Sequence, residues 1–340
     1  MRSLPGSLRG GKYFCCADSW PVKHSLVLSL NHLLVQQDSW PEYHRENRTM
    51  KWKGRRASTN VEDARGRRTA SSMAGAGMLL NFVGRRFGIK GILVIIVIGA
   101  VMWKMGLVDT SQLVGGSPQT QSGPVQASAE EQERFAFVEV ILADTEDVWT
   151  AEFNRHEGTY QEPVLVIYRR QTRTACGAGM AQMGPFYCPG DQKVYIDLGF
   201  YDELANSLRA PGDFAQAYVL AHEVGHHVQY LLGTSQKVAA MRGRPDYNEY
   251  SVRLELQADY YAGVWAHHDR NYLERGDIEE AMQAANAVGD DAIQGKTRGK
   301  IVPHSFTHGT SEQRMRWFNK GLQSGRIEDG DTFSMPYSDL

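Results

Sequence analysis

The chain has 340 residues, of which 42% are hydrophobic and 22% charged, and its net charge is −2. This composition is ordinary for a globular protein, and the near-neutral charge argues against a nucleic-acid-binding function. At this length we expect one sizeable domain with accessory segments.

The first segment, residues 1–49, is predicted to be a leader or an over-called upstream extension, with Met50 as the true start. Its apolar stretch, His24–Val35, is too short to span a bilayer and is not followed by a small-residue cleavage site. The next segment, residues 50–88, is predicted to be a basic cytoplasmic segment. Because residues 51–90 are rich in Arg, Lys, Gly and Ser, we expect disorder or weak structure there.

An apolar segment follows at residues 89–108, and as a helix its roughly 20 residues would be about 30 Å long. It predicts a transmembrane helix; the alternatives are a buried helix or a signal-peptide core. Basic residues precede it and acidic residues follow it, which predicts a single-pass bacterial inner-membrane protein with a cytoplasmic N-terminus. Residues 109–128 predict a flexible linker, and residues 129–335 a domain in the periplasm or outside the cell.

The start of this domain predicts an amphipathic helix from Glu130 to Asn154 and strands at Val164–Tyr168 and Val194–Leu198. Cys176 and Cys188 lie between the two strands and could join the connecting loop. In an oxidising compartment we expect a disulfide. The alternative is a metal-binding pair, but no partner His or Cys is nearby.

A longer helix is predicted over residues 214–232. Asp213 suits its N-terminus, where the helix dipole favours a carboxylate, and Gly233 suits its C-terminus. Gly225 costs about 1 kcal/mol of helix propensity relative to Ala. We therefore expect another element to pack closely against Gly225.

This helix contains the pattern His-Glu-x-x-His. His222 and His226 are four residues apart and share one face, so they can bind one metal ion. Glu223 can reach a water on that metal and act as general base. The alternative is a pair of ordinary helical histidines, and His227, which points away from His226, is expected to be one of these.

A second helical pattern carries Glu255 and Asp259, again four residues apart among apolar residues and alanines. Glu255 is the predicted third metal ligand. Asp259 is predicted to accept a hydrogen bond from a ligand histidine and fix its tautomer. The alternative is a solvated acidic face.

The C-terminal part predicts a helix from Asp277 to about Ile293. Asp290 and Asp291 are expected to form a solvated end, and the alternative is that they bind a cation. After it, His308 is a candidate stabiliser of an oxyanion, and Arg314 could orient His308 or Glu255. The alternative is a plain helix start in which Thr310 or Ser311 is the N-cap. Both can hold together.

These residues together resemble the neutral zinc metallopeptidases of the YpfJ type, from about Met50 to Phe333. The resemblance rests on these segments: Met50–Arg56, Asn60–Asp63, Cys176-Gly177, Gly184–Pro189, His222–His226, Glu255–Asp259 and Ser305–Arg314. The Glu-x-x-x-Asp element and the spacing of five residues between His308 and Arg314 also resemble the membrane-bound gluzincins related to the CAAX prenyl protease. This chain differs in having Gly309 where those enzymes often have proline.

The resemblance implies that Glu255 is the third ligand and His308 the oxyanion stabiliser. It also implies that a strand near Tyr195 pairs with extended substrate. The family often has cysteines where this chain has Tyr260 and Gly330, so their joint absence suggests a missing disulfide.

We therefore predict a mainly α, α+β zincin-like domain with a small sheet, preceded by one transmembrane helix. It would bind one Zn²⁺ and hydrolyse peptide bonds in a protein or peptide substrate, with Glu223 as general base. One alternative is a non-catalytic zinc-containing envelope protein that acts as a binding or scaffold module. Another is a soluble cytosolic peptidase whose apolar segment is packed in the core.

Overall fold

The computed structural model describes residues 50–67 and 125–340. The predicted leader (1–49), the predicted membrane span (89–108) and most of the predicted linker (109–128) lie outside these residues. Within them, no helix is long and apolar enough to cross a bilayer.

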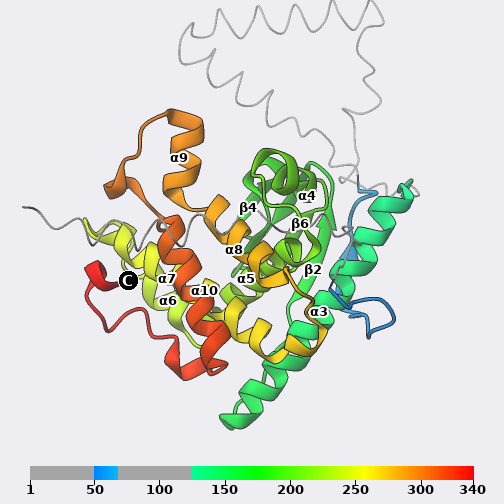
Figure 1. Ribbon diagram of the computed structural model, residues 1–340, viewed down its shortest axis with the longest axis horizontal. Coiled ribbons are helices and arrows are strands. Elements are labelled where there is room, and N and C mark those ends of the chain that lie inside the picture. The colour runs from blue at the N-terminus through cyan, green and yellow to red at the C-terminus, as the bar shows by residue number, and fades with distance from the viewer. Residues whose placement is uncertain (1–49, 68–124) are drawn as a thin grey trace, which may run out of the picture. The chain divides into compact units, whose positions relative to one another are not determined.

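Helices make up most of the described structure, and they surround a small sheet (Figure 1). The strands are β1 (Val61–Asp63), β2 (Val164–Tyr168), β3 (Gln171–Thr174), β4 (Gly177–Met180), β5 (Phe186–Cys188) and β6 (Lys193–Asp197). The main helices are α3 (Ala129–Arg155), α4 (Phe200–Asp202), α5 (Asp213–Leu231), α6 (Thr234–Ala239), α7 (Tyr247–His268), α8 (Asp277–Ala287), α9 (Asp290–Arg298) and α10 (Ser311–Ser324). This confirms the predicted α+β, mainly α class.

The main sheet has the strand order β1-β2-β6-β5. Strands β1, β2 and β6 run parallel, whereas β5 runs antiparallel to β6. One face of β2 and β6 (Leu165, Ile167, Val194 and Ile196) joins the buried residues of α3, α5, α7, α8 and α10 in one continuous hydrophobic core, and the other face belongs to a second, smaller cluster. Burial of this apolar surface fixes α5 against the sheet on one side and against α7 and α8 on the other.

Several predicted boundaries are confirmed within a residue or two. Helix α3 begins at Ala129, where the Ser128 side chain accepts a hydrogen bond from the Glu131 backbone N–H, and α5 covers the predicted 214–232 helix. Gly233 follows α5 in the left-handed conformation (φ +78°), as a helix C-terminus requires.

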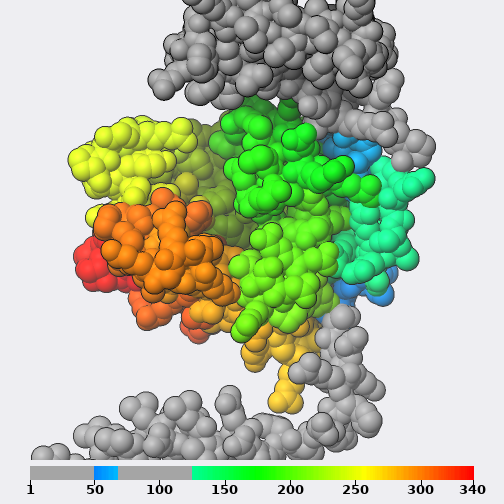
Figure 2. Space-filling view, turned by 90° about the horizontal axis from the view of Figure 1, so that it is seen from above, coloured from blue at the N-terminus to red at the C-terminus, as the bar shows by residue number. Residues whose placement is uncertain are grey.

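The expectation of disorder for residues 51–90 is wrong for residues 51–67. Strand β1 pairs with β2, with Val61 opposite Leu165, and places this segment inside the main sheet. Ion pairs join it to α3: Arg55 Nη2 lies 2.6 Å from Asp144, and Arg65 Nη1 lies 3.3 Å from Glu131. Figure 2 shows this blue segment against the teal α3. The basic residues therefore stabilise the fold by pairing with carboxylates of α3.

The predicted helix 277–293 is two helices, α8 and α9, separated at Gly289. A Cβ at Gly289 would lie 2.4 Å from the backbone nitrogen of Ser311, so only glycine allows the start of α10 to pack there. The break points the beginning of α9 toward the loop before α10.

Candidate metal centre and active site

Helices α5 and α7 approach closely at Gly225. A Cβ on Gly225 would lie 3.0 Å from the backbone oxygen of Ala258, so a larger residue would push the two helices apart. The predicted close approach is confirmed. It brings the histidines of α5 next to the carboxylates of α7.

The three predicted metal ligands meet at one point. The Glu255 carboxylate lies 3.3 Å from His222 Nε2 and 3.5 Å from His226 Nε2. Two ligand atoms of a tetrahedral zinc ion, each at about 2.0–2.1 Å from it, are about 3.3–3.4 Å apart. These residues therefore fit Zn²⁺ in type, number and spacing. They form one of two groups of potential ligands that the described residues contain.

The second ring nitrogen of each histidine is held by a neighbour. His222 Nδ1 lies 2.8 Å from Asp259 Oδ1, and His226 Nδ1 lies 2.9 Å from the side-chain oxygen of Gln229. Because a carboxylate or amide oxygen only accepts, the proton is on Nδ1 and the Nε2 lone pair is free for a metal. The role of Gln229 was missed. Its signal was a polar residue on a buried helix face, three positions after a ligand.

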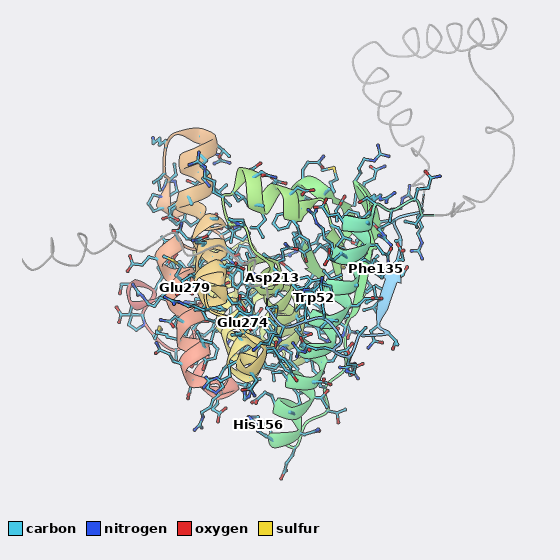
Figure 3. All side chains as sticks on the ribbon, turned by 45° about the vertical axis from the view of Figure 1, so that its right-hand side comes forward. Trp52, Phe135, His156, Asp213, Glu274 and Glu279 are labelled. Atoms are coloured by element: carbon cyan, nitrogen blue, oxygen red, sulfur yellow. A yellow bond between two sulfur atoms is a disulfide. The ribbon has the colours of Figure 1, made fainter. Side chains whose placement is uncertain are left out.

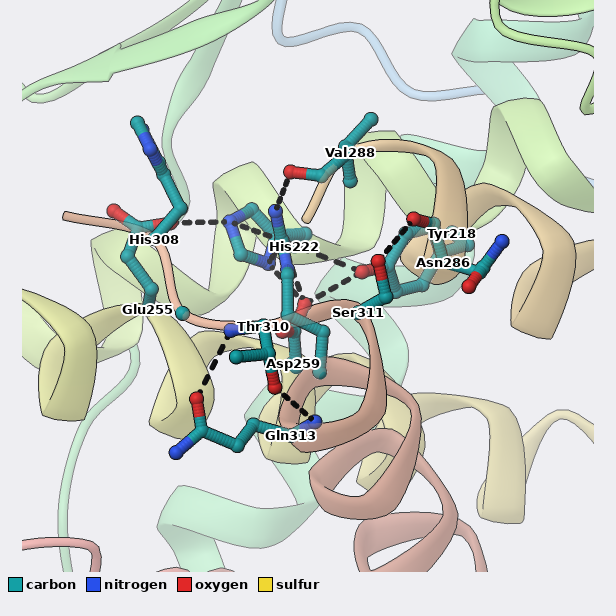
Figure 4. A network of polar contacts seen from close by, with 12 residues as sticks. Tyr218, His222, Glu255, Asp259, Asn286, Val288, His308, Thr310, Ser311 and Gln313 are labelled. Atoms are coloured by element: carbon teal, nitrogen blue, oxygen red, sulfur yellow. Dashed lines mark hydrogen bonds and ion pairs between the residues drawn. The ribbon is translucent and has the colours of Figure 1, made fainter. Parts of the chain in front are cut away.

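Asp259 is fully buried and is the centre of a polar network (Figure 4). It accepts hydrogen bonds from Arg314 Nε (2.8 Å) and Nη2 (2.9 Å) and from the Tyr218 hydroxyl (2.6 Å). Burial raises the pKa of Asp259, but the positive charges of Arg314 and His222 outweigh it and lower the pKa to about 2. Arg314 therefore keeps Asp259 ionised and so orients His222. The prediction that Arg314 orients His308 or Glu255 was wrong.

The cluster attracts protons when no metal is bound. Burial lowers the pKa of His226, but the negative charge of Glu255 outweighs it and raises the pKa to about 9. Protons then compete with a cation for the same three side chains, so metal affinity rises with pH.

Glu223 follows His222 on α5 and is 8% exposed. It lies between His222 and His226 on the same helix, which places Glu223 next to the ligand set. His227 points elsewhere: its ring nitrogens contact the Tyr187 hydroxyl and the Gln161 carbonyl. It is a structural histidine, as predicted.

His308 lies in the loop before α10 and is held by Asp290. One oxygen of Asp290 accepts the backbone N–H groups of Thr307 (2.7 Å), His308 (2.6 Å) and Gly309 (3.2 Å), and the other lies 3.3 Å from His308 Nδ1. These contacts fix the position of the His308 ring. The solvated end predicted for Asp290 is wrong, because its residue is 8% exposed.

The helix-start alternative for this loop holds as well. Thr310 and Gln313 form a reciprocal capping box that begins α10, and this fixes the loop that carries His308.

Comparison with known proteins agrees with this geometry. The family described as "Putative neutral zinc metallopeptidase" matches residues 50–333. The chain belongs to this family. It is 49% identical over 290 residues to the "Uncharacterized protein YpfJ" of Escherichia coli K12, covering 84% of this chain and 99% of that one. It is 43% identical over 188 residues to the "Uncharacterized protein Rv2575" of Mycobacterium tuberculosis H37Rv, covering 52% and 64%. No solved structure matches.

In this metallopeptidase domain, the strand near Tyr195 does not have the predicted substrate-pairing position. Tyr195 belongs to β6, which pairs with β2 on one side and β5 on the other, so both of its edges are taken. Of the described strands, β5 is the edge strand of the main sheet next to α5.

The cysteine predictions are consistent with the structure. Cys176 and Cys188 form a disulfide that joins the β3–β4 hairpin to β5. Residues 260 and 330 also touch, because a Cβ on Gly330 would lie 2.5 Å from the Tyr260 ring. The buried Tyr260 ring therefore packs directly against Gly330.

Proposed function

We propose that this chain is a zinc-dependent endopeptidase. The observation that carries the proposal is the convergence of three ligand atoms, His222 Nε2, His226 Nε2 and a Glu255 oxygen, beside an acidic residue that is not a ligand. A catalytic zinc site has three protein ligands and leaves one position for water or substrate.

The side chains divide the chemistry between them. Zn²⁺, when bound, supplies a Lewis acid that polarises a carbonyl and lowers the pKa of water. Glu223 takes the proton from the attacking water and passes it to the leaving amine. Protonated on both ring nitrogens, His308 donates Nδ1–H to Asp290, which raises the pKa of His308, and donates Nε2–H to the oxyanion that develops on the peptide carbonyl.

The rival function is a non-catalytic zinc protein of the cell envelope. A structural zinc site more often has four protein ligands with cysteines among them, and it has no use for a general base. Glu223 and the three-ligand set therefore favour the peptidase.

The test is the Glu223→Gln variant, with Glu249→Gln on α7 as an exposed control. We expect Glu223→Gln to bind zinc like the parent and to cleave an unfolded protein substrate about 10²–10⁴-fold more slowly. The control should keep parental activity. Full activity in Glu223→Gln would remove Glu223 from the mechanism.

We also propose that residues 89–108 attach the enzyme to the bacterial inner membrane, with the catalytic domain on the periplasmic side. The Cys176–Cys188 disulfide supports an oxidising compartment. The β1–β2 pairing adds a constraint, because it requires residues 50–67 to be on the same side of the membrane as the catalytic domain. The pairing therefore favours an attachment that leaves both flanks of residues 89–108 on one side over the single-pass crossing expected from the charge pattern.

This arrangement can be tested with a membrane-impermeant maleimide on intact spheroplasts. Thr59→Cys and Thr150→Cys place single thiols on exposed positions of the two flanks, in a background with Cys15 and Cys16 changed to serine. We expect both to be labelled equally. Labelling of Thr150→Cys alone would place residues 50–67 on the opposite side and contradict the proposal.

A further inference from the structure

A second group of carboxylates is separate from the metal site. Asp213 at the start of α5 and Asp277 and Glu280 at the start of α8 have carboxylate oxygens within 4.8 Å of one another. Asp277 is 1% exposed, and the other two are partly buried. Three carboxylates this close repel one another unless a positive charge is shared among them.

No side chain of the described residues provides that charge, since none of their ion pairs includes Asp213, Asp277 or Glu280. Backbone N–H groups compensate in part: Phe214 donates to Glu280 (3.0 Å) and Glu274 donates to Asp277 (2.7 Å). One oxygen of Asp213 is buried without a hydrogen-bond partner. Burial and the neighbouring carboxylates raise the pKa of Glu280 to about 7 and that of Asp277 to about 6.

The chain at Met50 lies beside this cluster, because the next residue, Lys51, pairs with Glu274, whose backbone N–H donates to Asp277. Burial raises the pKa of Asp213, and a hydrogen bond from the Met50 N–H partly offsets that rise. The Met50 side chain is 1% exposed and belongs to the hydrophobic core. Lys51 fixes the next residue, with its N–H on the Tyr272 carbonyl (2.8 Å) and its Nζ 3.0 Å from Glu274. Figure 3 labels Asp213 and Glu274 together with the neighbouring Trp52.

The family match also begins at residue 50, and 84% of this chain covers 99% of the E. coli relative. Residue 50 is a methionine followed by a bulky lysine, a context in which an initiator methionine stays on the chain.

We propose that translation of the functional protein starts at Met50 and that its α-ammonium group binds between Asp213, Asp277 and Glu280. An amide nitrogen at this position has one N–H and no charge. An ammonium has three N–H donors and a full positive charge, which supply a partner for the orphan oxygen of Asp213 and the missing counter-charge. The inference does not depend on the peptidase activity.

The direct test is the N-terminus of the protein made from its own gene, determined by intact mass and N-terminal sequencing. We expect a chain that begins at Met50 with a free amine. A chain that begins upstream of Met50 would overturn the proposal.

A stability test checks for the ammonium itself through the sign of the Tm change that one substitution causes. In the chain that begins at Met50, Glu280→Gln removes a partner of the ammonium and should lower the Tm by about 2–4 °C. In the chain that begins at Met1, residue 50 has only an amide, so the same substitution relieves repulsion and should raise the Tm. Glu279 is an exposed neighbour on α8, and Glu279→Gln should change the Tm of neither chain.

The outcomes also separate the ammonium from a metal ion at this cluster. A Glu280→Gln effect of the same sign in both chains would overturn the proposal. Stabilisation by Ca²⁺ would also overturn it. If Ca²⁺ raised the Tm of the Met50 chain but not that of its Glu280→Gln variant, a metal ion and not the ammonium would fill the cluster.

Discussion

Replacing Arg314 with methionine tests the network behind the metal ligands. Arg314 donates two hydrogen bonds to Asp259, and their side chains are 5% and 0% exposed. Removing the cation leaves a buried carboxylate without its main partner, which costs about 3–5 kcal/mol. Arg316→Met is the matched control on the same helix. Arg316 donates to the Leu340 carbonyl (2.7 Å) and pairs with Glu312; the two charged side chains are 41% and 78% exposed, and such a pair contributes about 0.5 kcal/mol.

The assay is urea unfolding of chelator-treated protein, so that zinc binding does not add to the measured stability. We expect Arg314→Met to lose several-fold more stability than Arg316→Met. Combining Arg314→Met with Asp259→Asn removes both buried charges and should restore most of that loss. The double variant should still bind zinc about 10–100-fold more weakly, because His222 has lost its carboxylate. Equal stability losses for Arg314→Met and Arg316→Met would refute the reasoning.

Three further predictions concern the ligand, the loop and the pH dependence. Glu255→Ala should lose zinc on dialysis, and full retention would exclude Glu255 as a ligand. Asp290→Asn should keep its zinc but lower kcat about 10-fold, since His308 is less well held. An unchanged kcat would show that Asp290 does not position His308 for catalysis. Burial and the neighbouring Asp269 raise the pKa of Asp144 to about 8, although Arg55 lies 2.6 Å away. A raised carboxyl pKa means stability that is present at low pH and lost as the pH rises from about 4 to 8. Asp144→Asn should therefore flatten the Tm profile over this range, and a profile as steep as the parent's would contradict the assigned pKa.

The local patterns around the metal predicted the site well, because each depends on spacing within one helix. His222 and His226 share a face, as do Glu255 and Asp259, and Gly225 marks the crossing that brings the two helices together. Helix periodicity is a short-range property, so one sequence is enough to recognise it.

The missed features all depend on contacts between distant segments. Strand β1 has only three residues, Val61–Asp63, and gains its stability from β2 about 100 positions later. Its neighbouring arginines resembled a disordered basic segment until their carboxylate partners on α3 were known. In the same way, Asp290 resembled a solvated helix end because its three backbone partners lie 17–19 positions later, in the loop before α10.

The strand order was also beyond the reach of the sequence. The pattern around Tyr195 predicts a buried strand, and it is one, but nothing local indicates whether another strand pairs beyond it. The antiparallel β5 occupies that edge, and its three residues, Phe186–Cys188, are too few for a recognisable alternation.

The measurement that tests the central claim most directly is a zinc titration of the chelator-stripped enzyme, followed by cleavage of an unfolded protein substrate. The account predicts no cleavage without zinc, a rise in activity that stops at one zinc per chain, and equal zinc uptake without activity in Glu223→Gln. Cleavage by the stripped enzyme, or zinc-loaded protein in which Glu223→Gln and the parent cleave equally, would contradict a zinc peptidase centred on His222, His226 and Glu255.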